Sequence, residues 1–256
     1  RGSGYLICPR DCSLEVVPMD YELDARPAYT VATIALDPSE TITAEAGSLV
    51  SHTDSIEMET GIGDEGEGFL ESVKDSVLGD ESLFRNRFTA EGAPGQVSLA
   101  PNVPGDVTVV DLEGNSLYLQ SGAYVAAESG ITLDTEVGGL DTLLGGEGLF
   151  FLEASGRGKL FLGSFGGVYR QEVGRGETFT VDSGHVVAWD STMSYNTERV
   201  GGMKETLFSA EGLVMRFEGP GEVFVQTRNY DNFISDIVGR MPSQNSNGGG
   251  GMDVDF

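Results

Sequence analysis

The residues of this chain most able to bind a soft metal or attack a substrate are two cysteines and two histidines. Cys8 and Cys12 form a C-x-x-x-C pair, and His185 lies in a pattern similar to that of the cupins. A closed zinc site takes four ligands, and a metal-binding cupin needs further histidines, whereas His52 is the only other one. A disulfide between the cysteines would need a sharp bend. The pattern predicts exposed or lightly packed thiols, and no metal.

His185 also closes a short run that contains the residue types of a catalytic triad, with Asp182 and Ser183 before it. Triad partners must meet in space, and neighbours in sequence do not form a proton relay. His185 further takes the place of Ser48 and Ala123 in the repeat described below, a position that a small or polar residue can fill. We therefore expect a structural histidine and no catalytic residue.

Residues 61–66 match the dinucleotide fingerprint G-x-G-x-x-G letter by letter. In a dinucleotide-binding fold this loop follows a strand, opens a helix and turns its amides toward a pyrophosphate. Here Asp64, Glu65 and Glu67 would repel that ligand, and no βαβ pattern surrounds the loop. We interpret the segment as a flexible loop and expect no cofactor.

Carboxylates crowd residues 54–81, which contain a single lysine. Carboxylate oxygens suit hard cations such as calcium, but the spacing is not that of an EF-hand, and a solvated acidic face is the simpler interpretation. Glu81, Glu147 and Glu211 take one position in a repeated pattern. These repeat-equivalent carboxylates could ring an axis or accept hydrogen bonds from turn amides.

The overall charge excludes several partners. Lys and Arg number 15 and Asp and Glu number 41, so the formal net charge is −26. Phosphate contacts require a Lys/Arg surface, so we expect no nucleic acid, and docking on anionic lipid is disfavoured. No run approaches the roughly 18 apolar residues of a membrane span. The composition indicates a soluble, intracellular and cytoplasmic protein, with the membrane periphery left open.

Lysine is scarce among the cations, since only Lys74, Lys159 and Lys204 occur beside twelve arginines. An acid excess with so little lysine favours a high-salt source, where salt screens charges within a few ångströms. An ordinary acidic protein remains the alternative.

The elements that must position these residues are strands. The 37 glycines punctuate short runs rich in Val, Leu, Phe, Tyr and Thr. Such runs, at residues 107–112, 116–120, 159–162 and 222–226, predict the strands of an all-β sandwich or barrel. Parallel α/β architecture is disfavoured because no helical pattern alternates with them.

Four sequence patterns recur in the same order three times along the chain. A tight turn enters a strand, a threonine-bearing strand follows, a Glu-Gly/Ser-Leu pattern comes next, and a closing strand starts at Gly95, Gly158 or Gly221, 63 residues apart. We predict three tandem repeats of double-stranded-β-helix type, at about residues 20–104, 105–170 and 171–229, packed around a pseudo-threefold axis. Residues 1–19 form an N-terminal extension. Residues 230–256 form a tail that is flexible from about residue 240.

Each predicted repeat carries an apolar loop just before its Glu-Gly/Ser-Leu pattern, with the spacing of a short amphipathic helix in the first. Threefold symmetry would gather these loops on one rim, as a collar for assembly; the alternative is that they cap the ends of the barrel. The apolar residues are Phe69, Leu70, Val73, Leu140, Leu143, Leu144, Met203, Leu207 and Phe208.

Four stretches, residues 79–88, 147–150, 200–213 and 219–229, resemble the altered inheritance of mitochondria protein 24 family. They contain the patterns Glu-Gly-Leu-Phe, Val-Gly-Gly-x-Lys-x-x-Leu-Phe and Gly-Pro-Gly-x-Val-x-x-Gln-Thr-Arg-Asn. The resemblance implies tandem β modules similar to the tryptophan RNA-binding attenuation protein. It also implies a link to membrane and mitochondrial organisation, with no assigned reaction.

Two functions from different classes follow. The first is a non-enzymatic scaffold that self-associates, as a trimer in the simplest case, or binds a protein partner through its apolar loops. The alternative is a small-molecule or metal-binding β-barrel with cupin-like logic, which would require a buried polar pocket with converging histidines.

Overall fold

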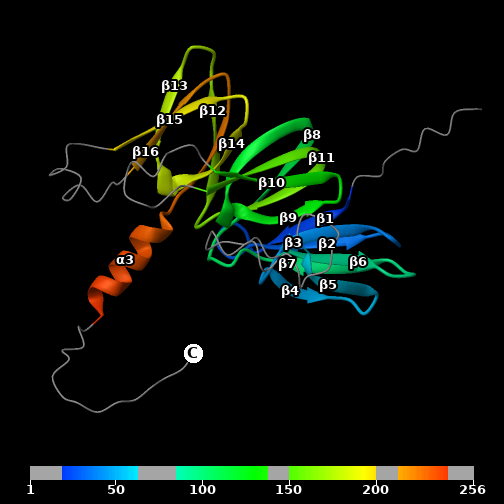
Figure 1. Ribbon diagram of the computed structural model, residues 1–256. Helices are drawn as coiled ribbons and strands as arrows, with labels where there is room; N and C mark the ends of the chain where they lie inside the picture. Colours follow the sequence, from blue (N-terminus) through cyan, green and yellow to red (C-terminus); the bar gives the residue numbers. More distant parts are fainter. Residues whose placement is uncertain (1–18, 63–84, 138–149, 200–212, 242–256) are drawn as a thin grey trace, which may run out of the picture.

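The computed structural model describes residues 19–62, 85–137, 150–199 and 213–241. All named strand pairs in this part of the chain are antiparallel, and its one α-helix is α3 (Tyr230–Arg240). Figure 1 shows the strands stacked as a continuous body from which α3 projects. The all-β prediction is therefore confirmed, whereas α3 was not anticipated.

The first part of the body is a set of short strands with clear alternation. In β2 and β3 every second side chain is buried, and these positions hold Ala, Ile and Leu. β-branched and apolar residues at a period of two favour a strand with one buried face. The strands are β1 (Tyr21–Asp24), β2 (Val31–Leu36), β3 (Thr41–Glu45), β4 (Leu49–His52), β5 (Ile56–Ile62), β6 (Arg85–Ala90) and β7 (Gly95–Leu99).

The second part uses two strands of 14 residues, β8 (Val107–Gln120) and β11 (Phe150–Gly163). The two strands predicted at residues 107–112 and 116–120 are thus one. Their register against β11 shifts between Ser155 and Arg157, near Gly114 and Gly156, which both have positive φ. Glycine allows this backbone, so both strands bend together and continue. The shorter elements here are η1 (Ser121–Ala123), β9 (Tyr124–Glu128) and β10 (Ile131–Val137).

The third part again consists of short strands, followed by α3. A 3-10 turn, η3 (Ser183–His185), leads into β14 just as η1 leads into β9. The strands are β12 (Val168–Val173), β13 (Thr178–Asp182), β14 (Val186–Asp190), β15 (Ser194–Arg199), β16 (Leu213–Glu218) and β17 (Gly221–Gln226).

The same four pairings occur in all three parts. In the first, β7 pairs with β2 and β4, and β6 pairs with β3 and β5. In the third, β17 pairs with β12 and β14, and β16 pairs with β13 and β15. In the second, the long β11 takes both central places, between β8 on one side and β9 and β10 on the other. Gly95, Gly158 and Gly221 each begin the closing strand segment opposite the end of the opening one.

Two further pairings join the parts into one array. β9 pairs with β3, and β14 pairs with β8, so each part adds a strand to the part before it. The result is a ten-stranded sheet flanked by a four-stranded sheet and a three-stranded sheet. β4 ends the four-stranded sheet and β13 ends the three-stranded one. Figure 1 places β13 at the upper left and β4 at the lower right of the body.

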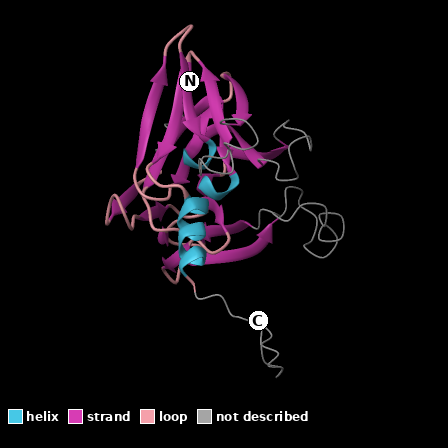
Figure 2. Cartoon of the chain, turned by 90° about the vertical axis from the view of Figure 1, so that its left-hand side faces the viewer, coloured by secondary structure: helices cyan, strands magenta, loops and turns pink. Residues whose placement is uncertain are grey.

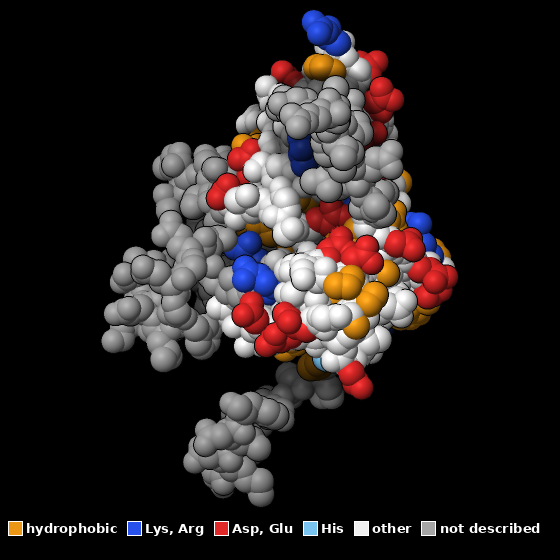
Figure 3. Space-filling view, turned by 90° about the vertical axis from the view of Figure 1, so that its right-hand side faces the viewer, with side chains coloured by type: hydrophobic (Ala, Val, Ile, Leu, Met, Phe, Trp, Pro, Cys, Tyr) orange, Lys and Arg blue, Asp and Glu red, His pale blue; other side chains and the backbone are white. Residues whose placement is uncertain are grey.

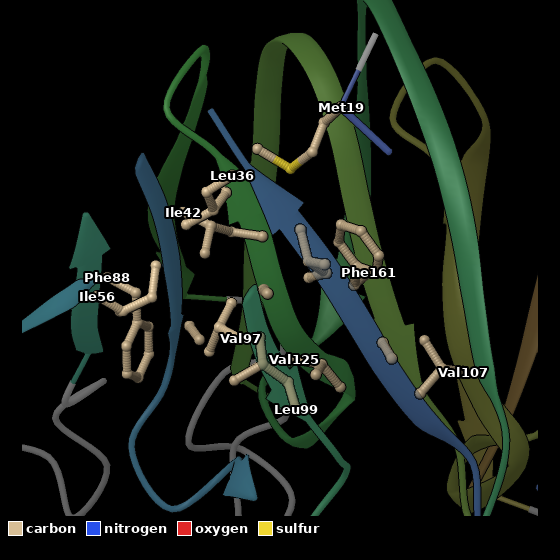
Figure 4. Packing of buried hydrophobic residues seen from close by; sticks show 14 of the residues in the cluster. Met19, Leu36, Ile42, Ile56, Phe88, Val97, Leu99, Val107, Val125 and Phe161 are labelled. Carbon is tan, nitrogen blue, oxygen red and sulfur yellow. The ribbon is translucent and has the colours of Figure 1, made fainter. Parts of the chain in front are cut away.

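The core consists of three clusters, and the first two each include residues of the next part. Figure 4 shows the first, in which Val125 and Phe161 of the second part lie among side chains of the first. The second cluster includes Val187 and Phe224 of the third part. The third surrounds the single tryptophan, Trp189, which is fully buried.

A buried carboxylate, Asp106, fixes the start of β8. Its Oδ1 accepts hydrogen bonds from Arg26 Nε at 2.9 Å and Thr30 Oγ1 at 2.7 Å, and its Oδ2 accepts one from Arg26 Nη2 at 2.7 Å. Its main chain bonds Gly166 and Ser164. Three distant chain segments therefore meet at one ionised side chain, which we call the Asp106 junction.

Candidate functional site

The apolar loop residues and the repeat-equivalent carboxylates of the sequence analysis lie outside the described residues. The same holds for Cys8 and Cys12 and for most of the Gly-rich segment 61–66. The structure describes the strands on either side of each loop: β5 and β6, β10 and β11, and β15 and β16 form the three antiparallel pairs that these loops connect.

The two histidines contact different parts of the fold. His185 Nδ1 lies 2.8 Å from the carbonyl oxygen of Gln226, whose side chain donates to Gly184 O. His52 Nδ1 lies 2.9 Å from Thr53 O. Each ring is thus held by a backbone carbonyl, and the described residues do not bring the histidines together, as a cupin-like site would require.

The Asp182 carboxylate does not orient His185. Its Oδ1 accepts hydrogen bonds from the amide of Gly184 at 2.9 Å and from Asn229 Nδ2 at 3.0 Å. Asp182 therefore caps the 3-10 turn η3 and connects it to the start of α3. The Asp-Ser-Gly-His segment at residues 182–185 therefore has a structural role in the described fold.

An open hollow of roughly 480 Å³ lies beside the start of β1. Its lining includes Asp20, Asp37 and Glu40 together with Leu36 and Gln96. Glu40 Oε2 accepts the Asp37 amide at 2.8 Å, which closes the turn between β2 and β3. Among the described residues, no group of three or more His, Cys, Asp or Glu side chains is arranged to hold a metal ion.

The most distinctive surface of the described chain is one face of α3. Its apolar residues recur at intervals of three and four, so they form a continuous stripe. All are between 37% and 61% exposed in the described structure. Figure 2 shows the helix on the outside of the strands. The residues of this α3 stripe are Tyr230, Phe233, Ile234, Ile237, Val238 and Met241.

The amino end of α3 is fixed by its cap. Asn229 has extended backbone angles, and its Oδ1 accepts the amide of Asn232 at 3.1 Å. Because Asn229 Nδ2 also binds Asp182, one side chain both caps the helix and attaches it to β13. The rings of Tyr230 and Phe233 pack on Phe165, at centroid distances of 5.8 and 5.2 Å.

The charges beside the stripe are arranged along the helix dipole. Asp231 lies in the first turn and Arg240 in the last, where each is favourable, and Arg240 Nε binds Asp236 at 3.0 Å. With two acids and one base, the helix lacks the basic face typical of helices that lie on anionic membranes. The stripe therefore suits a protein surface. Figure 3 shows acidic side chains spread over the opposite end of the body.

Sequence reasoning missed α3 because the Ser/Asn/Gly run after residue 242 dominated the composition of the tail. Two signals could have identified it. Asn229 is a preferred N-cap, and the apolar residues that follow have the spacing of an amphipathic helix.

Comparison with known proteins gives three findings. The profile of the family described as mitochondrial biogenesis AIM24 matches residues 21–228. An uncharacterised protein of Streptococcus pyogenes serotype M6 is 27% identical over 233 residues, which covers 89% of this chain and 93% of that protein. A crystal structure of a Streptococcus pyogenes protein is similar with a TM-score of 0.73 and 26% identity, over 87% of this chain and 100% of the other. Among the described residues, no helix is both long and apolar enough to cross a membrane.

Proposed function

The chain belongs to the mitochondrial biogenesis AIM24 family, and from that premise we propose that it is a non-enzymatic assembly protein whose copies associate through α3. The observation that carries the proposal is the α3 stripe, six apolar side chains exposed along one face of a capped helix. Water penalises exposed apolar surface at roughly 25 cal/mol per Å², so covering this face favours association.

The partner that fits the stripe is α3 of a second copy, running antiparallel. In that arrangement the first turn of one helix, which holds Asp231, lies beside the last turn of the other, which holds Arg240, so the helix ends that meet carry opposite charges. The two helix dipoles also oppose each other favourably. A helix of 11 residues is only about 16 Å long, so the contact is small and depends on concentration.

The finer architecture belongs to the same proposal. We take the three parts of the body as three copies of one β unit, similar to the modules of the attenuation protein, because their strand pairings recur. A closed pseudo-threefold ring would pair β4 with β13. Since both strands lie at sheet edges in the described part of the chain, we favour an open array. The apolar loops predicted from the sequence would supply a second contact surface in the assembly.

Substitutions on the stripe test the proposed function. We expect the full chain to form dimers or larger species at about 100 µM in light scattering. Replacing Ile234, Ile237 and Val238 together by Ser should weaken this association at least tenfold, because each exchange removes part of the apolar face and costs roughly 1 kcal/mol or more.

The matched control changes the polar face of the same helix, Asn232→Ser with Ser235→Ala, and should leave the mass distribution unaltered. Circular dichroism of each variant checks that the body remains folded. A stripe variant that associates like the unmodified chain, or an unmodified chain that is monomeric at every concentration, would contradict the proposal.

The charge leads to a separate prediction, which is that the protein is adapted to high salt. With a formal net charge of −26, repulsion between carboxylates destabilises the compact state when it is not screened. We expect the melting temperature to rise by roughly 5 °C or more between 0.05 and 2 M KCl, which corresponds to about 2 kcal/mol at this chain length. The control is a scan in sucrose, which favours burial without screening charge. Equal melting temperatures at both KCl concentrations would refute the adaptation.

A further inference from the structure

The same kind of strand pairing joins each part of the chain to the next. In both joints, the strand that follows a tight turn pairs with the strand that leads into the tight turn of the part before it. At the first joint β9 lies beside β3, with Ala126 opposite Ala44 and Ala127 opposite Thr43. At the second joint β14 lies beside β8, with Ala188 opposite Leu119. Both pairings are antiparallel and have the same register relative to the pattern of strands.

Side-chain hydrogen bonds support both joints. The hydroxyl of Tyr124 donates to Thr43 O at 2.8 Å across the first. At the second, the hydroxyls of Ser116 and Ser191 lie 2.6 Å apart, and Gln120 Nε2 donates to Ser183 O at 2.7 Å. The joints are thus complete interfaces with main-chain pairing, apolar packing and polar contacts.

At each end of the array, one strand that could take part in such a joint has no partner part beside it in the described residues. β4 is the strand that follows the tight turn of the first part, and β13 is the strand that leads into the tight turn of the third part. In the described residues, β4 pairs only with β7, and β13 pairs only with β16. Each therefore presents one open edge where its counterparts have a partner strand.

Exposure distinguishes these strands from their counterparts. Val50 of β4 is 55% exposed, whereas the corresponding Val125 and Val187 are 2% and 1% exposed. In β13, Phe179 and Val181 are only partly buried, whereas the corresponding residues of β3 and β8 are fully buried. The residues that become buried when a joint forms are therefore the ones left accessible at the two ends.

We propose that β4 of one copy pairs antiparallel with β13 of a second copy, continuing the internal array from chain to chain. The register of the internal joints places Ser51 opposite Val181, His52 opposite Thr180 and Thr53 opposite Phe179. This inference deepens the proposed assembly function by naming a second contact between copies. The inference rests on the proposed function only for the premise that copies of this chain associate.

The contact differs in symmetry from the pairing of α3. It joins the end of one array to the beginning of another, so it is heterologous and propagates until a ring closes or a filament grows. It is also more polar than the internal joints, since Ser51 and His52 stand where the first joint has Ala126 and Ala127 and the second has Ala188 and Trp189. Association through this edge is therefore reversible, and main-chain hydrogen bonds contribute most of its affinity.

Disulfide trapping tests the register directly. In the full chain carrying Cys8→Ser and Cys12→Ser, the pair Ser51→Cys and Val181→Cys should give a ladder of covalent dimers, trimers and larger species under mild oxidation, because directly opposed residues meet the Cα separation of a disulfide. Reduction should collapse the ladder. A mixture of the two single variants should give covalent heterodimers and no longer ladder.

The matched control keeps Ser51→Cys and moves the second cysteine three residues along the strand, to Thr178→Cys, about 10 Å away. It should cross-link at least tenfold more slowly. Equal rates for both pairs, no ladder from the matched pair, or a disulfide formed only within one chain would each overturn the inference.

The outcome separates the two proposals. If the unmodified chain associates through α3 but the matched cysteines give no ladder, the edge contact is wrong and the assembly function stands. If the matched ladder forms while the Ser-substituted α3 stripe leaves the mass unchanged, the edge contact is supported and the α3 proposal is wrong. The two readouts therefore fail independently.

Discussion

Replacing Asp106 by Ala is expected to lower the free energy of unfolding by about 2–4 kcal/mol, because it removes the acceptor of two buried donors and of a half-exposed guanidinium. The Asp106 side chain is 4% exposed, and Arg26 binds both of its oxygens. Without the carboxylate, the buried hydroxyl of Thr30 and the amide of Val107 lose their side-chain acceptor. Urea titration followed by the fluorescence of Trp189, the single tryptophan, measures the change.

Glu59→Ala is the control, since Glu59 also binds an arginine, Arg87 at 3.4 Å, but the two side chains are 60% and 45% exposed. An exposed pair contributes little, so this variant should lose less than about 1 kcal/mol. Equal losses of unfolding free energy in the two variants would show that the burial of Asp106 does not increase its contribution to stability.

The same junction should make stability depend on pH in a defined direction. Burial by itself raises the pKa of Asp106, but the hydrogen bonds from Arg26 and Thr30, the charge of Arg26 and the Val107 amide together lower it below its usual value. A carboxyl with a depressed folded pKa stabilises the fold fully above its unfolded pKa of about 3.9, and this contribution is lost as the pH falls through the folded pKa. The stability difference between the unmodified chain and Asp106→Ala should therefore be constant near pH 7 and narrow below about pH 4.

Much of the fold follows from sequence alone because strands leave a local signature. The alternating apolar residues of β2 and β3 mark strands without knowledge of any partner, and so do the repeated glycines that begin β7, the second half of β11 and β17. The division of β8 into two strands was wrong for a physical reason. Glu-Gly-Asn usually ends a strand, but here Gly114 bends β8 together with β11, so pairing continues across the bend.

The contacts that hold the array together could not be predicted in this way. Asp106 looks like any loop carboxylate in the sequence, and its partner Arg26 lies 80 residues away. The open edges of β4 and β13 are likewise invisible in a sequence whose three parts look alike, because pairing between parts depends on where the array begins and ends. By contrast, α3 had a local signal, so its omission reflects the weight given to composition over spacing.

Gly105→Ala should have the other large effect, a loss of more than about 3 kcal/mol or failure to fold, because nothing around this residue can yield. A Cβ at Gly105 would overlap the carbonyl oxygen of Ser164 and lie 3.2 Å from Gly166 N. Those groups are main chain and are fixed in place, since Asp106 N donates to Gly166 O at 3.0 Å and Thr30 N donates to Gly105 O at 3.0 Å.

The control for this variant is Gly122→Ala in the 3-10 turn η1, where an added Cβ would meet no atom within 4 Å. It should change stability by no more than about 0.5 kcal/mol. Because both variants add one methyl group to a glycine, the difference between them isolates the close approach of the backbones at Gly105. That approach lets the segment after β7 and the segment after β11 share main-chain hydrogen bonds, which holds the first part of the array against the second. A Gly105→Ala protein with unchanged urea midpoint would mean that the close approach of the backbones at Gly105 contributes nothing measurable to holding the first two parts together.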